Sequence, residues 1–354
     1  MVASVMGAPW QRDGRAWAGR ARIPWQTDGM ADVRSIALGD NTVHLVRRGG
    51  ASLLVDTGPD FAGAWEALRE GLGGDVPEVV VATHGHHDHA GLGRKWQEAG
   101  TPVWVGAADG TLTARPLLQS PAETAAMLAW AEGTGAPPET LAHVRERIES
   151  RRAAALRAAE SPEYPEDGVR WPTGLRYPPF EADRLIEGDA EVGGVEILEA
   201  PGHTPGNAVL AVREEGWLFS GDQLLPNVDP LPAIQFVAEG EELQRFPSLP
   251  HFAASLERLA EGEFTRCFPG HGEPFDGAGE AIAGALSRIE RRCARVGDSL
   301  RKAGPGSVYD LCVRLYPRGT ERRFWQTASS VQGQLDLLAS RGEAREQGGV
   351  WEGC

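Results

Sequence analysis

The sequence predicts an α/β sandwich, and two observations support this fold class. Between residues 34 and 105, short apolar runs alternate with segments of helical spacing in the order strand, helix, strand, helix, strand. Several apolar runs also end beside glycine and a histidine or aspartate, as expected where a sheet presents polar side chains along one edge. With 41% apolar and 24% charged residues, the 354-residue chain has the composition of a globular protein.

Each expected element follows from a local pattern. Residues 34–58 predict two strands around the turn at 47–50, where an Arg-Arg-Gly-Gly segment separates two apolar runs. Helices are expected where apolar residues recur every three or four positions. The expected strands lie at 43–46, 52–55, 79–82, 103–105, 195–198, 208–212, 217–220 and 265–268. The expected helices of the sandwich lie at 61–72, 92–99 and 252–260.

Composition changes between residues 111 and 180. Residues 123–132 and 139–160 are rich in Ala, Glu and Arg and predict a helical insertion, which an aromatic and proline-rich stretch follows. These aromatic side chains either pack the insertion onto the core or form a lid over a site, and both interpretations remain open. The aromatic residues are Tyr164, Trp171, Tyr177 and Phe180.

The two ends of the chain differ from its middle. Residues 1–22 predict a loose N-terminal arm, which leaves 23–280 as the main domain. Residues 281–354 predict a small module that resembles a winged helix. Its expected elements are helices at 282–303, 307–316 and 324–341 and a ribbon that ends at Trp351.

Charge and cysteine content limit the class of protein. The net charge of −15 disfavours a general affinity for nucleic acid or for an anionic membrane. No stretch approaches the roughly 20 apolar residues of a membrane span. The four cysteines form no CxxC pair, which favours reduced thiols and a cytoplasmic protein.

Seven potential metal ligands stand near the ends of the expected strands. Glycines beside them permit the tight turns that aim an imidazole or a carboxylate inward. Imidazole suits zinc and similar ions, and a carboxylate adds negative charge and can bridge two ions. Seven ligands exceed the four of a structural zinc site and match two ions with positions open to water. The seven are His84, His86, Asp88, His89, His203, Asp222 and His271.

These residues resemble the metallo-β-lactamase superfamily. Residues 84–89 carry the HxHxDH pattern, the later single ligands follow in the family's order, and residues 56–58 resemble its Asp-Thr-Gly strand end. The resemblance covers about residues 23–280 and implies a four-layer αββα sandwich.

The resemblance also implies a division of the ligands. His84, His86 and His203 would bind one ion, while Asp88, His89 and His271 would bind the other. Asp222 would bridge the two, and a hydroxide held between the ions would attack the substrate, with Asp88 and Asp222 as the catalytic residues. Asp56 is expected to orient a histidine, and His87 is expected not to be a ligand.

The favoured function is hydrolysis of an ester, thioester or lactone, similar to glyoxalase II. Familiar lactamases carry a cysteine among the ligands where this chain has Asp222, so a dedicated β-lactamase is disfavoured. The cofactor is expected to be two divalent ions, with zinc favoured over manganese or iron. The expected partner is a small-molecule substrate. A flavin-dependent diiron protein is a third class, but no segment resembles a flavin-binding domain.

The alternative function is a phosphodiesterase or single-strand endoribonuclease. From Leu286 onward the chain has 12 Lys and Arg against 8 Asp and Glu, so this module could contact nucleic acid. The acidic remainder of the chain disfavours a polyanion, and the basic side chains more simply form a solvated helix face or a homodimer contact. They are Arg288, Arg291, Arg292, Arg295, Arg301 and Lys302.

Overall fold

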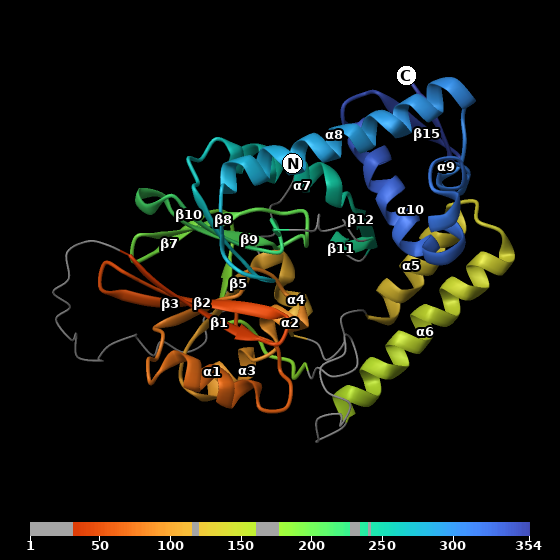
Figure 1. Ribbon diagram of the computed structural model, residues 1–354. Helices are drawn as coiled ribbons and strands as arrows, with labels where there is room; N and C mark the ends of the chain where they lie inside the picture. The colour runs from red at the N-terminus through yellow and green to blue at the C-terminus, as the bar shows by residue number, and fades with distance from the viewer. Residues whose placement is uncertain (1–30, 115–119, 161–176, 227–233, 240–241) are drawn as a thin grey trace, which may run out of the picture.

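The computed structural model describes residues 31–354 except 115–119, 161–176, 227–233 and 240–241. The predicted N-terminal arm, Tyr164 and Trp171 lie outside the described residues. Two six-stranded sheets form the centre of the molecule, and helices cover their outer faces (Figure 1).

The first sheet has the strand order β1-β2-β3-β4-β5-β6. β1, β2 and β3 pair antiparallel, whereas β3 to β6 pair parallel. Its strands are β1 (Asp32–Leu38), β2 (Asn41–Arg48), β3 (Ala51–Val55), β4 (Val79–Val81), β5 (Val103–Gly106) and β6 (Arg184–Ile186).

The second sheet has the order β14-β13-β10-β9-β8-β7, and only β10 and β13 pair parallel. Its strands are β7 (Ala190–Val192), β8 (Val195–Glu199), β9 (Ala208–Val212), β10 (Trp217–Gly221), β13 (Arg266–Pro269) and β14 (Phe275–Asp276).

Alternation along the strands creates the layers. On β3, Leu53 and Val55 face the space between the sheets, where they join a cluster that includes Phe219 of β10. Leu54 faces the opposite way and packs with Leu68 of α1 (Ala64–Leu72). Successive side chains of a strand point to opposite faces, so one apolar strand serves two cores. The predicted four-layer αββα arrangement is therefore present.

The outer helices follow from the same logic. α1 and α3 (Gly93–Glu98) cover the first sheet, and α7 (Ser248–Ala260) and α8 (Ala278–Ala303) cover the second (Figure 1). Leu256 of α7 and Ile282 of α8 are fully buried in the core cluster behind β9 and β10. The apolar stripe of each helix thus buries against one sheet face.

The predicted insertion forms α4 (Gly110–Thr113), α5 (Pro121–Gly133) and α6 (Pro138–Glu160). α5 begins with a capping box, in which the Ser120 hydroxyl accepts from the Glu123 amide and the Glu123 carboxylate accepts from the Ser120 amide. Phe180, after the insertion, is 5% exposed and packs into the core beside α3.

The C-terminal segment contains the three predicted helices and the predicted ribbon. They are α8, α9 (Val308–Leu315), α10 (Pro317–Ser340) and the hairpin β15 (Ala344–Gln347) with β16 (Val350–Gly353). α10 starts earlier than predicted, and its helical geometry is interrupted at Arg323 (φ −143°, ψ 49°), so the predicted helix corresponds to the part after this break. The predicted module boundary at residue 280 falls in the first turn of α8.

The insertion and the C-terminal helices pack together. Met127 and Ala131 of α5 and Val144 and Ile148 of α6 belong to the same core cluster as Leu335 of α10. The Trp130 indole stacks edge-on against Trp325 at 5.1 Å and donates to the Gln332 side chain at 3.3 Å. A hairpin of β11 (Gln235–Glu239) and β12 (Glu242–Phe246) lies beside α5 and α10 (Figure 1).

Candidate metal centre

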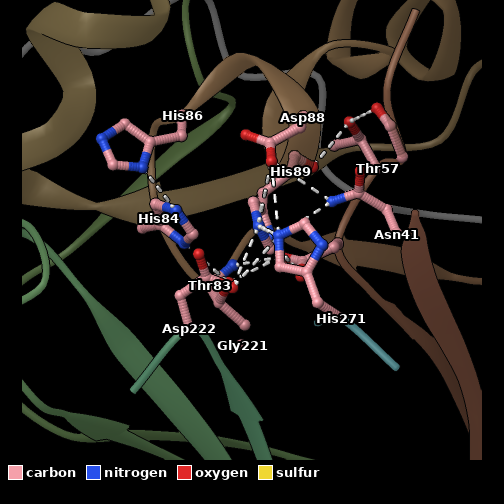
Figure 2. Close-up of polar contacts among 12 residues, drawn as sticks. Asn41, Thr57, Thr83, His84, His86, Asp88, His89, Gly221, Asp222 and His271 are labelled. Carbon is pink, nitrogen blue, oxygen red and sulfur yellow. Dashed lines mark hydrogen bonds and ion pairs between the residues drawn. The ribbon is translucent and has the colours of Figure 1, made fainter. Parts of the chain in front are cut away.

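Strand ends of both sheets meet at one edge of the sandwich. His84 and His86 follow β4, His203 follows β8, Asp222 follows β10 and His271 follows β13. Asp88 and His89 lie in the single-turn helix α2 (His87–Ala90), for which His86 is the N-cap. The structure brings all seven predicted ligands together (Figure 2; His203 is not labelled there).

One cluster contains three histidines. Nδ1 of His86 lies 2.9 Å from Nε2 of His84 and 3.1 Å from Nε2 of His203. The ring pairs stand nearly perpendicular, at 83° to 88°, so their nitrogen atoms converge on one point rather than stack.

A second cluster contains two histidines and a carboxylate. Nε2 of His89 lies 3.3 Å from Nε2 of His271. Oδ2 of Asp88 lies 3.4 Å from the same His271 atom and 3.7 Å from Nε2 of His89. Within each cluster the candidate donor atoms lie within 4.8 Å of one another.

Asp222 lies between the clusters. Its Oδ2 is 3.5 Å from Nε2 of His203 in the first cluster. Its Oδ1 is 3.4 Å from Nε2 of both His89 and His271 in the second. Each oxygen of one carboxylate therefore faces a different group of imidazoles.

Asp56 supports the second cluster from behind. Its Oδ2 is 2.8 Å from Nδ1 of His89, and its Oδ1 accepts from both the amide and the hydroxyl of Thr83. At φ 65° it is the one described non-glycine residue with positive φ, a conformation that aspartate tolerates better than most residues. The predicted role of Asp56 in orienting a histidine is confirmed by this contact.

A buried carboxylate that the sequence analysis missed joins two ligand loops. Oδ2 of Asp109 accepts from the Gly85 amide at 2.7 Å and the Thr204 hydroxyl at 2.6 Å, and Oδ1 accepts from the Gly206 amide at 2.7 Å. Asp109 is fully buried at the end of β5. Burial raises its pKa, the donors lower it, and because both oxygens accept, the contacts fit the carboxylate form. No spacing in the sequence marked this residue.

The loop that carries His271 is held by the start of β2. Nδ1 of His271 is 2.9 Å from the Asp40 carbonyl oxygen, and the Thr42 amide donates to the Gly270 carbonyl at 2.8 Å. The buried Asn41 amide lies 3.4 Å from Oδ2 of Asp88 (Figure 2). Asn41 was also missed, because asparagine beside a turn is an ordinary sequence feature.

Two further histidines lie close to the clusters without joining either of them. His87 is buried, belongs to none of the ligand groups in the described part of the chain, and faces Tyr177 edge-on at 6.1 Å. His44 is a core histidine whose Nε2 donates to the Pro269 carbonyl at 2.9 Å. The Tyr177 hydroxyl donates to the Gly85 carbonyl at 2.8 Å, so this aromatic residue contacts the ligand loop.

The histidines of the two clusters differ in the direction of their pKa shifts. Burial lowers the pKa of His203 to about 4 and lowers that of His84 well below its usual value, so both rings are neutral near pH 7 and offer a lone pair. Burial opposes the charge on His89 as well, but Asp222, Asp56 and Asp88 raise its pKa well above the usual value. The second cluster therefore favours positive charge.

The donor set fits a pair of divalent ions. Two imidazole nitrogens bound to one tetrahedral zinc ion stand about 3.3 Å apart, comparable with the 2.9 Å to 3.3 Å found between neighbouring rings. Oδ1 of Asp222 is buried yet has no hydrogen-bond partner among the described residues. Its nearest charged neighbours are the imidazoles of His89 and His271 at 3.4 Å, and a buried carboxylate oxygen without a hydrogen bond is costly unless a further group satisfies it.

The predicted basic face of α8 is largely engaged in local contacts. Arg301 and Lys302 both pair with Asp298, at 2.6 Å and 3.1 Å. Arg295 lies over the Tyr316 ring at 4.9 Å. These contacts agree with the interpretation of a solvated helix face.

The fold is a sandwich of two sheets, and its site is a group of His and Asp side chains at one edge. Together they define a class of candidate metal-binding α/β proteins. A family model described as the metallo-beta-lactamase superfamily matches residues 37–271. The chain belongs to the metallo-beta-lactamase superfamily, as the HxHxDH pattern predicted.

Relatives agree with this assignment. The chain is 28% identical over 337 residues to the "Probable metallo-hydrolase YqjP" of Bacillus subtilis (strain 168), a match that covers 90% of this chain and 92% of that protein. It is 34% identical over 105 residues to "Beta-lactamase-like protein 2 homolog" of Drosophila melanogaster, covering 30% of each chain.

Solved structures share the fold over nearly the whole chain. The metallo-beta-lactamase family protein TTHA1429 from Thermus thermophilus superimposes with a TM-score of 0.63 at 22% identity, covering 92% of this chain and 98% of that one. A beta-lactamase domain protein from Burkholderia ambifaria gives 0.61 at 19% identity, covering 93% of each. Within the described residues, no helix has the length and apolar character that crossing a membrane requires.

Proposed function

We propose that the protein is a binuclear metal-dependent hydrolase that cleaves an ester, thioester or lactone. His84, His86 and His203 would hold one ion, and Asp88, His89 and His271 the other. The observation that carries this proposal is the placement of Asp222, because one carboxylate oxygen faces each cluster and a bridging ligand needs that geometry. Zinc suits a donor set of imidazoles and carboxylates without thiolate.

The side chains of the site would bind the metal ions, and neighbouring residues orient the histidine rings. When bound, two such ions supply an acidified water as nucleophile and polarise the scissile carbonyl oxygen. Asp56 fixes the ring of His89, and the Asp40 carbonyl fixes that of His271, so each Nε2 points into the site. Asp88 lies at the second cluster, where its carboxylate could orient the attacking nucleophile, and Asp222 faces both clusters. Asp88 and Asp222 are therefore the proposed catalytic residues.

A carbonyl substrate suits the charges of the site better than a polyanion. In the described part of the chain, no lysine or arginine pairs with Asp88 or Asp222, whose charge partners are histidines. Phosphodiester recognition commonly relies on arginine or lysine. An ester, thioester or lactone carries no such charge at the reacting bond.

The test combines metal analysis with a substrate panel. The purified protein is loaded with zinc, manganese or iron and assayed on a thioester, a lactone, an aryl ester, a bis-aryl phosphodiester and single-stranded RNA. We expect two metal equivalents and turnover of one of the first three substrates. Turnover of RNA or the phosphodiester alone would favour the endoribonuclease alternative, and an iron protein with oxidase activity would refute the hydrolase.

Asp222→Ala tests the bridging assignment. We expect this variant to lose metal and activity together, because both clusters lose a shared donor. Asp276→Ala is the matched control, since this carboxylate is exposed on β14 and pairs only with Arg266 in the described structure. Unchanged metal content in Asp222→Ala would show that Asp222 is not a ligand.

A further inference from the structure

A cavity lies between the insertion and the C-terminal helices. It has a volume of about 430 Å³, within the range typical of small-molecule sites. Residues of α6 line one side, and residues of α9 and the first part of α10 line the other. None of the seven candidate metal ligands lines it, so it is distinct from the metal centre.

Part of the lining of this cavity is apolar. Val144 and Ile148 on α6 and Phe324 on α10 are buried, and they line the cavity together with the partly buried Trp325. Val313 also lines it and is 43% exposed, so the apolar lining extends to the surface of the molecule. A concave site with an apolar lining and a few polar groups is typical of small-molecule binding.

Two guanidinium groups line the same cavity without a partner in the described part of the chain. Neither Arg147 nor Arg322 forms a hydrogen bond or ion pair with another described residue. Arg145, two residues away on α6, instead pairs with Glu132 at 3.1 Å. The one carboxylate among the described lining residues is Glu139, so the cavity carries more positive than negative charge. Arginine suits carboxylate, sulfonate or phosphate groups because its planar fork can donate two parallel hydrogen bonds.

We propose that this cavity binds a small amphipathic anion, with the apolar part between α6 and α10 and the anionic group at Arg147 and Arg322. The two features together select the ligand class. A neutral apolar compound would leave the two arginines unused, and a small inorganic anion would leave the apolar walls exposed. The site joins two segments that lie far apart in the sequence.

The test uses two fluorescent probes that differ in charge. Anilinonaphthalene sulfonate carries an anionic group on an apolar ring system, and N-phenylnaphthylamine has similar rings without that group. Both are titrated into the full-length protein, and fluorescence gives stoichiometry and affinity. We expect the sulfonate to bind at one site per chain and decanoate to displace it.

Variants separate charge from apolar packing. Arg147→Gln and Arg322→Gln are each expected to weaken sulfonate binding roughly tenfold, the loss typical of a charge-assisted hydrogen bond, and to leave the neutral probe unchanged. Val313→Trp fills the cavity and should weaken both probes. Arg145→Gln is the matched control on the same helix and should change neither. Circular dichroism checks that each variant is folded.

The metal centre is excluded by repeating the titration on Asp222→Ala. Unchanged sulfonate binding there is expected, because none of the seven candidate metal ligands lines the cavity. The proposal is overturned if the wild-type chain does not bind the sulfonate, if both arginine variants bind it as well as the wild type, or if binding is lost in Asp222→Ala. None of these results depends on which substrate the enzyme hydrolyses.

Discussion

Asp109→Asn should disturb the metal centre without touching any ligand. The carboxylate accepts three hydrogen bonds, two at Oδ2 and one at Oδ1. Asparagine has a single acceptor oxygen. In the better of its two orientations the amide oxygen keeps the Gly85 and Thr204 donors, and its NH₂ group then faces the Gly206 amide, another donor, at the 2.7 Å contact.

The magnitude follows from that geometry. One charge-assisted hydrogen bond is lost, worth about 1.5–3 kcal/mol, and a buried donor is left unsatisfied at about 1–3 kcal/mol. The free energy of unfolding of the metal-free chain should fall by about 3 kcal/mol. Because Gly85 and Thr204 adjoin the first-cluster ligands, zinc affinity should fall about 10–100-fold, as for other residues that support metal ligands.

Zinc affinity is measured by competition with a chromophoric chelator, and stability by urea denaturation. Asp183→Asn is the matched control. Asp183 is likewise a carboxylate that accepts hydrogen bonds, one from the Val103 amide and one from the Gln97 side chain, but it lies away from the candidate ligands. It should lower stability slightly and leave zinc affinity unchanged. If Asp109→Asn behaves like this control, Asp109 does not position the metal centre.

Three further predictions concern pH, metal removal and truncation. Burial lowers the pKa of His44 to about 4, so the unfolded chain binds more protons between pH 4 and 6.5 and stability falls as pH drops through this window. Other buried histidines, such as His203, contribute in the same way to both proteins. Urea denaturation should therefore show that the wild type loses about 2 kcal/mol more than His44→Gln from pH 7 to 5, and an equal loss in both proteins would refute it. Removal of the metal with a chelator should lower the unfolding temperature measured by calorimetry. The size of the shift depends on the ratio of the free metal concentration to its Kd. An unchanged unfolding temperature would contradict a metal site that exists only in the folded protein. Deletion of 281–354 should give an insoluble or unfolded chain, because it strips Val331 and Leu335 from the core shared with α5; a soluble truncated chain with a cooperative unfolding transition would refute it.

Much of the sandwich could be predicted, because its strands are short apolar runs that end at glycine. β9 and β10 agree with their predicted positions to within a residue. Two strands lacked such a run. β1 is buried only toward its C-terminal end, and β14 has only two residues. Their pairing depends on neighbouring strands rather than on their own composition, so no local pattern indicated them.

The candidate ligands were predictable for a different reason than the residues that support them. His84 and Asp222 belong to a motif whose residue types already indicate metal chemistry. Asp109 and Asn41 are single polar residues, and their roles arise only because the fold brings them beside loops that lie 97 and 230 positions away in sequence. The packing of α5 and α6 on α10 was likewise beyond any local pattern, since the sequence of a helix does not say which other helix it will contact.

The shared core of the insertion and the C-terminal helices constrains how the chain can fold during synthesis. Met127 and Ile148 leave the ribosome long before Leu335, which they pack with. At typical rates of about 5–20 residues per second, that interval is on the order of ten seconds or more. During this time the buried faces of α5 and α6 have no partner from α10. The last strand of the sandwich ends at Asp276, so these faces still lack that partner after all the strands have been made, and a chaperone that holds this helical pair would act on a chain whose sandwich strands have already emerged.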